Sequence, residues 1–294
     1  MNLIASIVVT FHPDDAALRA ICALASQTSH VIVVDNTAEV ETTTKLQRIQ
    51  ASAPNIFILL SNSENFGVAA ALNRGMRYAQ KLSAEWALTL DQDSRATVGM
   101  VDALLATRQA FSEPFRPRVA LLAPSIVDRQ TKAVSDPTIR TFKEVSTAIT
   151  SGNLINVSAW QDVGGYDERL FIDYVDHDFC FRLRRAGFRI AVCDGAVLQH
   201  TIGDARQIRP LGYTVTVDQH SPLRYYYMTR NGFYFWKTYA CKDPFLRADK
   251  LNALKLLVKA TILDTRRIER LRMFWRGYRD YRAGRFGRYS PPPN

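Results

Sequence analysis

Hydrophobic residues in the first 125 positions gather in short, β-branched runs, separated by longer stretches with helical spacing. The runs predict five strands, at residues 4–10, 31–34, 56–60, 85–90 and 119–123. The stretches between the first four runs predict helices at residues 14–27, 41–51 and 65–81. Because near-continuous apolar strands alternate with helices, this pattern favours an α/β fold with a mostly parallel central sheet, flanked by helices on both faces.

Polar residues stand where the predicted strands end. Thr10, Asp35 and Asp91 fall at these carboxyl ends, the edge at which such sheets bind ligands. Asp91 and Asp93 are two residues apart, so on a strand both carboxylates would face the same side. Such a pair either binds a hard divalent cation or simply faces water, and its place beyond a strand favours a cation and phosphate site. No G-x-G-x-x-G or P-loop motif occurs, which argues against dinucleotide enzymes and P-loop NTPases.

From about residue 140 the pattern changes to shorter strands and glycine-rich turns, which indicates a smaller antiparallel half. An acidic segment in this half contains Asp173, Asp176 and Asp178, just before a predicted helix at residues 179–187. One of these aspartates is expected to cap the helix. Apolar neighbours predict partial burial, which would raise a carboxyl pKa toward the range of a general base.

Composition describes an ordinary core-forming protein of 294 residues with four widely spaced cysteines. Without metal-type spacing, these cysteines are expected to be reduced core residues of a cytoplasmic protein. There is no apolar run of about 18 residues, and the first ten residues lack a signal-peptide pattern.

The net charge of +10 is concentrated in the C-terminal region, where residues 245–294 hold 13 Lys and Arg against 4 Asp and Glu. Residues 246–282 have apolar side chains at helical intervals with basic residues between them, which predicts one or two basic amphipathic helices. Such helices suit an anionic membrane surface; the alternative is a helix packed on the body with a solvated basic face. No nucleic-acid-binding motif is present. Residues 284–294 are expected to form a flexible tail.

Several short motifs, in a fixed order over roughly residues 3–235, resemble the inverting family-2 glycosyltransferases of the GT-A fold. They are Val-Val-Asp-Asn at 33–36, Asn-Phe-Gly at 65–67, Asp-Gln-Asp-Ser at 91–94, Ser-Gly-Asn at 151–153, Gly-Gly-Tyr-Asp at 164–167 and Val-Asp-His-Asp at 175–178. Within that family, the segments around residues 91, 171, 198 and 221 look like bacterial rhamnosyltransferases that make surface polysaccharides such as O-antigen.

The resemblance implies roles for residues on the donor side. Asp35 would bind the nucleotide base, in a pocket lined by Thr10 and Phe11. Asn65, Gly67 and Asn73 would lie along the diphosphate, and Gln92 would also contact the donor. Asp93 would be the main metal ligand for Mg²⁺ or Mn²⁺, with Asp91 shared between ribose and metal and His200 as a further metal or diphosphate ligand.

The resemblance also implies a general base and an acceptor side. Asp176 aligns with the family's catalytic aspartate, although Val175 replaces the first residue of the usual Glu-Asp pair, which leaves Asp173 as an alternative base. The acceptor side would be formed by Gly152, Asn153, Asp178 and Arg230.

The implied activity is metal-dependent, inverting transfer of L-rhamnose from dTDP-β-L-rhamnose to a glycan or lipid-linked saccharide acceptor. It would take place at the inner face of the cytoplasmic membrane. The alternatives are a UDP-sugar donor (galactose, galactofuranose or N-acetylglucosamine) or a non-catalytic GT-A-like module that assembles partners on the membrane. The expected domains are a glycosyltransferase domain at 1–240, divided into a nucleotide-binding half (1–125) and an acceptor-side half (126–240), then a helical extension at 241–283 and the tail at 284–294.

Overall fold

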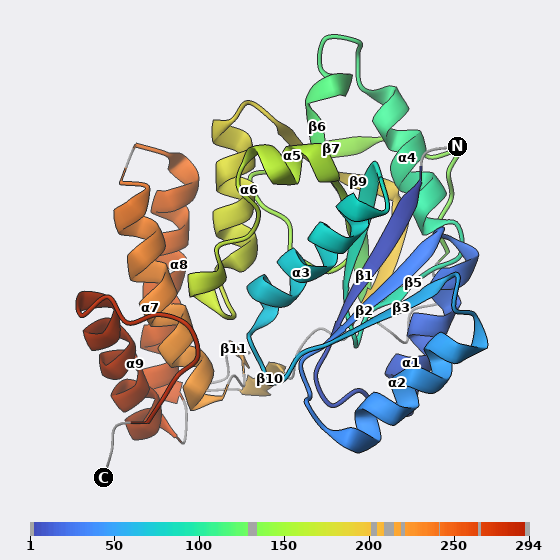
Figure 1. Cartoon of the computed structure of the whole chain (residues 1–294). Helices are drawn as coiled ribbons and strands as arrows, with labels where there is room; N and C mark the ends of the chain where they lie inside the picture. The colour runs from blue at the N-terminus through green and yellow to red at the C-terminus, as the bar shows by residue number, and fades with distance from the viewer. Residues whose placement is uncertain are drawn as a thin grey trace. The chain divides into compact units, whose positions relative to one another are not determined.

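A computed structural model describes residues 3–128, 134–200, 205–208, 215–218, 221–240, 242–263 and 266–291. The chain forms two compact units (Figure 1). The first comprises Met1–Phe171 and Val175–Thr201, and the second comprises Ile172–Tyr174 and Ile202–Asn294. The units divide at residues 201 and 202, whereas the sequence had indicated a domain boundary near residue 240.

Four parallel strands form the first half of the sheet in the first unit. They are β1 (Ile4–Thr10), β2 (His30–Asp35), β3 (Phe57–Ser61) and β4 (Trp86–Asp91), and they lie in the order β3-β2-β1-β4. The strands predicted from the apolar runs are confirmed, with small differences at their ends. β1 and β2 are rich in β-branched residues and almost wholly buried, as expected for strands covered on both faces.

The second half of the same sheet is mixed. β8 (Asn153–Asn156) is antiparallel to both β4 and β6 (Val119–Asp128), and β9 (Arg189–His200) is parallel to β6. Two short strands, β5 (Arg95–Ala96) and β7 (Phe142–Glu144), run antiparallel to β9. The nine-stranded sheet is therefore parallel from β3 to β4 and mixed beyond β4.

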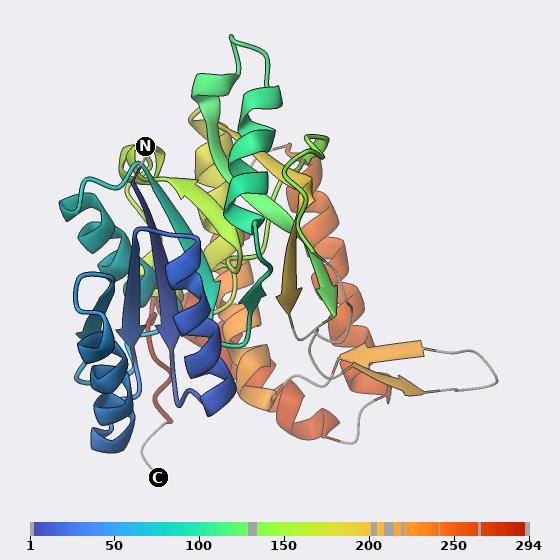
Figure 2. The same cartoon turned by 90° about the vertical axis from the view of Figure 1, so that its right-hand side faces the viewer.

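Helices cover both faces of this sheet (Figure 2). On one face α1 (Asp15–Ala23) and α4 (Met100–Ala110) supply Ile21 and Leu104 to the buried cluster that contains Ile4 and Val8 of β1. On the other face α3 (Val68–Lys81) packs so closely that a Cβ on Gly75 would lie 2.4 Å from Ile7. The remaining helices of the unit are α2 (Val40–Ser52), α5 (Val157–Asp162) and α6 (Val175–Arg185), with short 3-10 turns at Leu24–Ser26, Arg116–Arg118 and Glu168–Leu170.

The second unit is mainly helical. It contains α7 (Pro222–Thr238), α8 (Pro244–Leu263) and α9 (Arg267–Arg282), together with an antiparallel pair of strands, β10 (Ala205–Ile208) and β11 (Val215–Asp218). The expectation of one or two helices in the basic region is confirmed as two. None of the helices, as far as the structure describes them, is long and apolar enough to cross a membrane.

Residues 284–291 pack onto α7, so the expected flexible tail is wrong for this stretch. The backbone N–H of Tyr289 donates to the Tyr227 hydroxyl at 2.8 Å, and the Tyr289 ring contacts that of Tyr226. Aromatic side chains that lie among the arginines provide this packing. The expectation of a flexible tail rested on composition and did not include these aromatic contacts.

The cysteines that the structure describes are free thiols. Cys180 and Cys193 are buried as expected, and burial raises the pKa of each to about 12, so both remain protonated at neutral pH. Cys22 is exposed, contrary to the expectation of a core residue, because it lies on the outer face of α1. Cys241 lies outside the described residues.

Candidate active site

The carboxyl ends of the parallel strands bring the predicted nucleotide residues together. Thr10 pairs with Asp35 across β1 and β2, and Val9 pairs with Asp91 across β1 and β4. The edge inferred from the sequence is therefore formed by adjacent strands.

Asp35 is fully buried at this edge. Its Oδ1 accepts hydrogen bonds from the Thr10 hydroxyl at 2.9 Å and from the Thr37 hydroxyl at 2.7 Å. The backbone N–H of Thr37 is a third donor to Oδ1, at 3.2 Å. The other oxygen, Oδ2, is also buried and has no hydrogen-bond partner in the part of the chain that the structure describes. An unsatisfied buried acceptor costs about 1–3 kcal/mol, so Oδ2 is a candidate ligand contact.

Gln92 braces the segment after β1. Its Oε1 accepts from the Phe11 backbone N–H at 2.7 Å, and its Nε2 donates to the Phe11 carbonyl at 3.0 Å. The Phe11 ring remains 46% exposed. Gln92 was predicted to contact the donor, but its amide is used within the protein, where it fixes the position of Phe11.

Gly67 forms the turn into α3. The Asn65 Oδ1 accepts from the Gly67 N–H at 2.9 Å, and the Asn36 amide donates to the Gly67 carbonyl at 3.2 Å. Gly67 has a φ of +88°, and a Cβ at this position would lie 2.5 Å from the carbonyl oxygen of Phe171. Both the backbone conformation and the close approach therefore require glycine.

Asn73 is buried on α3 with its hydrogen-bonding capacity used. Its Nδ2 donates to the Tyr166 carbonyl and to Glu168, each at 2.8 Å. Its Oδ1 accepts from the Tyr166 N–H at 2.8 Å and from the Trp160 ring at 3.2 Å. This placement argues against the predicted contact with the diphosphate, because Asn73 instead ties α3 to the glycine-rich turn at 164–167.

Asp93 and His200 lie side by side because β5 pairs with the end of β9, with Arg95 opposite Gln199. The distance from His200 Nδ1 to Asp93 Oδ1 is 3.6 Å. The Ser94 hydroxyl binds His200 Nδ1 at 2.8 Å and the Ser151 hydroxyl at 2.7 Å, so Ser94 orients the imidazole and is itself held by Ser151.

Ser151 also links this network to β4, because its hydroxyl accepts from the Asp91 N–H at 2.9 Å. Among the described residues no group of three or more His, Cys, Asp or Glu side chains forms a metal site. Asp93 and His200, two of the three metal ligands that the resemblance implied, lie within 3.6 Å of each other, and the third, Asp91, joins the same network through its backbone N–H.

The acidic segment begins with strained backbone. Phe171, Asp173 and Tyr174 have φ values of 58°, 62° and 65°, each in the left-handed region that costs a non-glycine residue about 1–3 kcal/mol. α6 then begins at Val175, four residues before the predicted start, so Asp176 and Asp178 lie in its first turn.

Asp176 is held by its neighbour along the chain. Its Oδ1 accepts from the His177 backbone N–H at 2.8 Å and from His177 Nδ1 at 2.9 Å. Burial acts to raise the pKa of Asp176, but the hydrogen bonds and charge of His177 outweigh burial, so the pKa lies below its ordinary value. The expected raised pKa is therefore wrong, and the carboxylate is ionised at neutral pH, as a proton acceptor must be.

The other candidates around Asp176 are engaged in ion pairs. Asp178 is 1% exposed and binds the Arg182 guanidinium at 2.6 and 2.8 Å. In the second unit, Asp173 accepts from Arg224 Nε at 3.1 Å. These pairs favour Asp176 over Asp173 as the base, and they make Asp178 a structural residue rather than the predicted acceptor contact.

The remaining acceptor-side predictions fall on residues that support the fold. Arg230 is fully buried in the second unit, where its Nη1 donates to the Gly287 carbonyl at 2.7 Å and its guanidinium stacks on Tyr227. In the first unit, a Cβ on Gly152 would lie 2.7 Å from Pro124, and Asn153 is buried with its Nδ2 bound to the Ile149 carbonyl at 2.6 Å. The internal contacts of Arg230 and the close packing of Gly152 argue against direct contact with an acceptor, whereas the buried Asn153 Oδ1 has no hydrogen-bond partner within the described residues.

Four polar residues that matter in this arrangement were not predicted as site residues: Thr37, Ser94, Ser151 and His177. All four stand within two residues of a predicted one, at Asp35, Asp93, Gly152 and Asp176. That adjacency was the available signal, since a short polar side chain next to a carboxylate often binds it.

Comparisons with known proteins identify relatives of this chain. Residues 6–110 match the family described as glycosyl transferase family 2. The chain is 30% identical over 245 residues to the dTDP-rhamnosyl transferase RfbF of Shigella flexneri, which covers 78% of both chains. It is 23% identical over 208 residues to the low-salt glycan biosynthesis hexosyltransferase Agl10 of Haloferax volcanii, covering 64% of each.

The fold is similar to that of S. aureus TarS. The structure of TarS 1–349 superposes with a TM-score of 0.54 at 16% identity, covering 98% of this chain and 94% of that one. The full TarS chain gives a TM-score of 0.55, and this chain spans 44% of its length. The fold is thus the GT-A-like mixed sheet that the sequence predicted. Because a 30%-identical relative is matched over more than three quarters of both chains and residues 6–110 match the family, the chain belongs to glycosyltransferase family 2.

Proposed function

We propose that this glycosyltransferase transfers L-rhamnose from dTDP-β-L-rhamnose to a glycan acceptor and inverts the configuration at the anomeric carbon. The observation that carries the choice of donor is the 30% identity to a protein named as a dTDP-rhamnosyl transferase, over 78% of both chains. The geometry of the site supports the transfer chemistry independently of that choice.

The buried Oδ2 of Asp35 supports a pyrimidine donor. It would accept the ring N–H of thymine and so gain the hydrogen bond that it lacks within the described residues. The half-exposed ring of Phe11, fixed by Gln92, offers an apolar surface for the base. Uracil carries the same N–H group, so this contact suits dTDP and UDP donors alike.

Asp93 and His200 fit a divalent cation in part, since they supply one carboxylate and one imidazole within 3.6 Å of each other. The donor diphosphate and water would supply the other ligands. Mg²⁺ or Mn²⁺ held there would stabilise the negative charge that develops on the leaving diphosphate.

Asp176 supports general-base catalysis. The oxygen of an acceptor hydroxyl attacks C1 of rhamnose from the face opposite the diphosphate. The bond from C1 to the diphosphate oxygen breaks and its electron pair leaves with dTDP. The hydroxyl proton moves to Asp176, whose Oδ1 is already occupied by His177, so Oδ2 would receive it. Such base catalysis contributes about 10²–10⁴-fold, and the product would be an α-L-rhamnoside.

A UDP-sugar is the second candidate donor, because a TarS 1–349 structure with a TM-score of 0.53 is a complex with UDP-GlcNAc. UDP-galactose and UDP-galactofuranose belong to the same alternative. A non-catalytic module is less well supported, since the ionised Asp176 and the unsatisfied Asp35 oxygen both suit an active site.

The experiment that tests the donor is a turnover and thermal-shift panel of dTDP-rhamnose and the UDP-sugars, each with Mg²⁺ or Mn²⁺. We expect dTDP-rhamnose to give the largest stabilisation, because a bound ligand raises stability by mass action. A larger shift and faster turnover with a UDP-sugar would reject the rhamnosyl assignment. In the same assay, donor binding and turnover should require the divalent metal, and Asp93→Ala should lose both. Asp176→Asn should keep donor binding but lose transfer.

For the acceptor, we propose a lipid-linked saccharide of a surface polysaccharide, as in O-antigen synthesis, at the inner face of the cytoplasmic membrane. The local excess of nine positive charges in residues 245–294 supports an anionic membrane as partner. No nucleic acid is proposed as a partner.

A further inference from the structure

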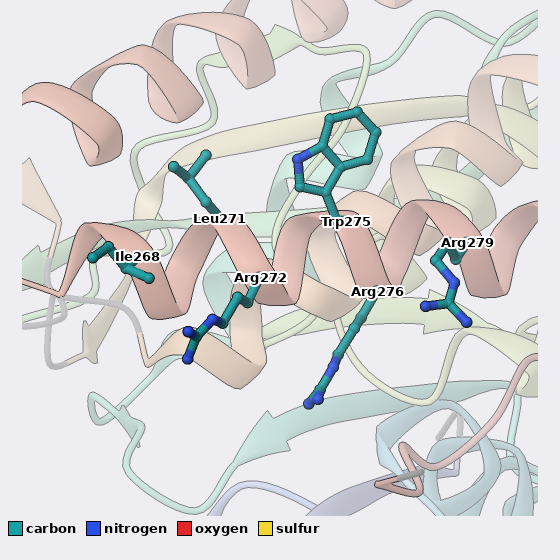
Figure 3. Close-up of a pocket in the computed structure, with 6 residues that line it drawn as sticks. All are labelled: Ile268, Leu271, Arg272, Trp275, Arg276 and Arg279. Atoms are coloured by element: carbon teal, nitrogen blue, oxygen red, sulfur yellow. The ribbon is translucent and has the colours of Figure 1, made fainter.

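α9 carries an amphipathic outer face in the second unit. Residues spaced three or four apart line a shallow groove of about 360 Å³ along this helix. These residues are Ile268, Leu271, Arg272, Trp275, Arg276 and Arg279 (Figure 3). The opposite face is the packed one, because Arg270 and Gly277 are buried and the rings of Tyr278 and Tyr281 contact Phe233 of α7.

One flank of the groove is apolar. Figure 3 shows the side chains of Leu271 and Trp275 on the same side of the helix. Ile268 is 62% exposed and Trp275 is 59% exposed. Large apolar side chains so exposed are typical of a surface that is covered in use, and tryptophan prefers the boundary between apolar and aqueous surroundings.

The other flank is basic. Figure 3 shows Arg272 and Arg276 on the side of α9 away from Leu271 and Trp275. Within the described residues, the Arg272 and Arg279 side chains make no hydrogen bond or ion pair, whereas Arg276 donates to the Tyr289 hydroxyl at 2.8 Å. α9 contains six arginines but two acidic residues, Glu269 and Asp280. Asp280 is already paired with Arg285. The groove therefore has unneutralised positive charge beside exposed apolar groups.

We infer that this face of α9 docks the enzyme on an anionic lipid bilayer. The arginines bind headgroup phosphates, and Ile268 and Trp275 enter the boundary between headgroups and acyl chains. Charge complementarity selects an anionic surface, and the apolar flank selects lipid over a purely polar polyanion such as nucleic acid. The inference rests on the proposed membrane location and names the surface responsible for it.

The test is binding of the full chain to vesicles of phosphatidylcholine, alone or mixed with phosphatidylglycerol. Two α9 variants are compared with the unmodified protein: Ile268→Ser with Trp275→Ser, and Arg272→Gln with Arg279→Gln. The matched control is Leu251→Ser with Leu254→Ser on α8, where both leucines are more than half exposed at 52% and 56%. Circular dichroism checks that every variant is folded.

We expect the unmodified protein to bind only the anionic vesicles, with salt weakening the binding. Both α9 variants should lose about tenfold or more in affinity, and the α8 control should bind as the unmodified protein does. Tryptophan emission should shift to the blue on binding, and the Trp275→Ser variant should lose this shift.

The inference is overturned if the α9 variants bind normally, or if the α8 control loses as much affinity as they do. An oligonucleotide that displaces the vesicles at equal concentration would reject lipid as the occupant. If the unmodified protein binds no anionic vesicle, the proposed membrane location itself fails. The donor assay, run without lipid, decides the catalytic proposal separately.

Discussion

His177 binds a single oxygen of Asp176 twice, through its backbone N–H at 2.8 Å and through its ring Nδ1 at 2.9 Å. Both contacts favour the ionised carboxyl and fix its orientation, because they hold Oδ1 in place. The pKa of Asp176 is lowered although burial opposes this. The carboxylate is thus ionised at neutral pH, as the proposed general base must be, and the same contacts reduce its strength as a base.

Replacing His177 should move the pH dependence of the proposed transfer. His177→Asn keeps the backbone N–H contact but removes the imidazole and its charge, so the pKa of Asp176 should rise. The base would then lose its negative charge at a higher pH. We expect the acid limb of kcat to move to higher pH, with the largest loss of rate on the acid side, around the ordinary pKa of aspartate of about 3.9.

His30→Asn is the matched control for this prediction, because His30 binds the Asn55 carbonyl on the exposed surface at the start of β2. Its pH profile should follow that of the unmodified enzyme. An unchanged acid limb in His177→Asn would show that the imidazole does not tune the base.

The lowered pKa of Asp176 should also make the stability of the fold depend on pH. The folded-state pKa of Asp176 lies below its ordinary value, so the ionised carboxyl stabilises the fold at pH values above its unfolded pKa. This contribution is lost as the pH falls through the folded pKa. Urea unfolding of the unmodified protein and of Asp176→Asn should therefore differ most near neutral pH and converge toward acid. A difference that grows on acidification would contradict the lowered pKa.

The sequence was informative where backbone pattern decides position. The apolar runs located the strands. Because Thr10 and Asp35 both end predicted parallel strands, they were expected at one edge of the sheet, and the register of β1 and β2 confirms this. The ordered motifs gave the family. The pairing of β5 with β9 brings His200 beside Asp93 over more than a hundred residues of sequence, and the resemblance, rather than any local pattern, had suggested it.

Side-chain roles were harder to predict, because the same residue types bind ligands and support folds. Asn73 and Arg230 belong to motifs of the family, yet each is buried with its polar groups bound inside the protein. Asp178 lies one helical turn from Arg182, which neutralises it. Whether a polar side chain is already satisfied depends on distant partners, such as Tyr166 for Asn73, and no local pattern contains them.

Asn73→Ala should therefore lower stability more than it lowers donor affinity. The substitution leaves the Trp160 and Tyr166 N–H groups and the Tyr166 carbonyl without their partner. A loss of about 2–3 kcal/mol in the free energy of unfolding is expected, measured by urea denaturation. A normal unfolding curve with a large rise in the KM for the donor would instead restore the diphosphate role predicted from the sequence.

Gly67→Ala should separate close contact from backbone strain. A methyl group at residue 67 meets the Phe171 carbonyl at 2.5 Å, and φ is +88°. Gly164 provides the control, because its φ of +79° is similar and nothing lies within 4 Å of a Cβ placed there. We expect Gly164→Ala to cost about 1 kcal/mol from φ alone and Gly67→Ala to cost clearly more. Equal losses in thermal unfolding would show that the turn at Gly67 can yield at no cost.

Asp35→Asn tests the proposed base contact at the buried oxygen. The substitution keeps the size of the side chain and can keep an oxygen for the Thr10 and Thr37 hydroxyls, but it puts an NH₂ group where Oδ2 now lacks a partner. An N–H of a pyrimidine base would then face another donor. Because a hydrogen bond to a charged group contributes about 1.5–3 kcal/mol, dTDP and UDP should both bind at least about tenfold more weakly, as measured by titration calorimetry. Ser6→Ala, which removes another buried hydroxyl of β1 bound to Thr28, should leave nucleotide affinity unchanged. If Asp35→Asn binds dTDP as tightly as the unmodified protein does, the base lies elsewhere and the unsatisfied oxygen serves another purpose.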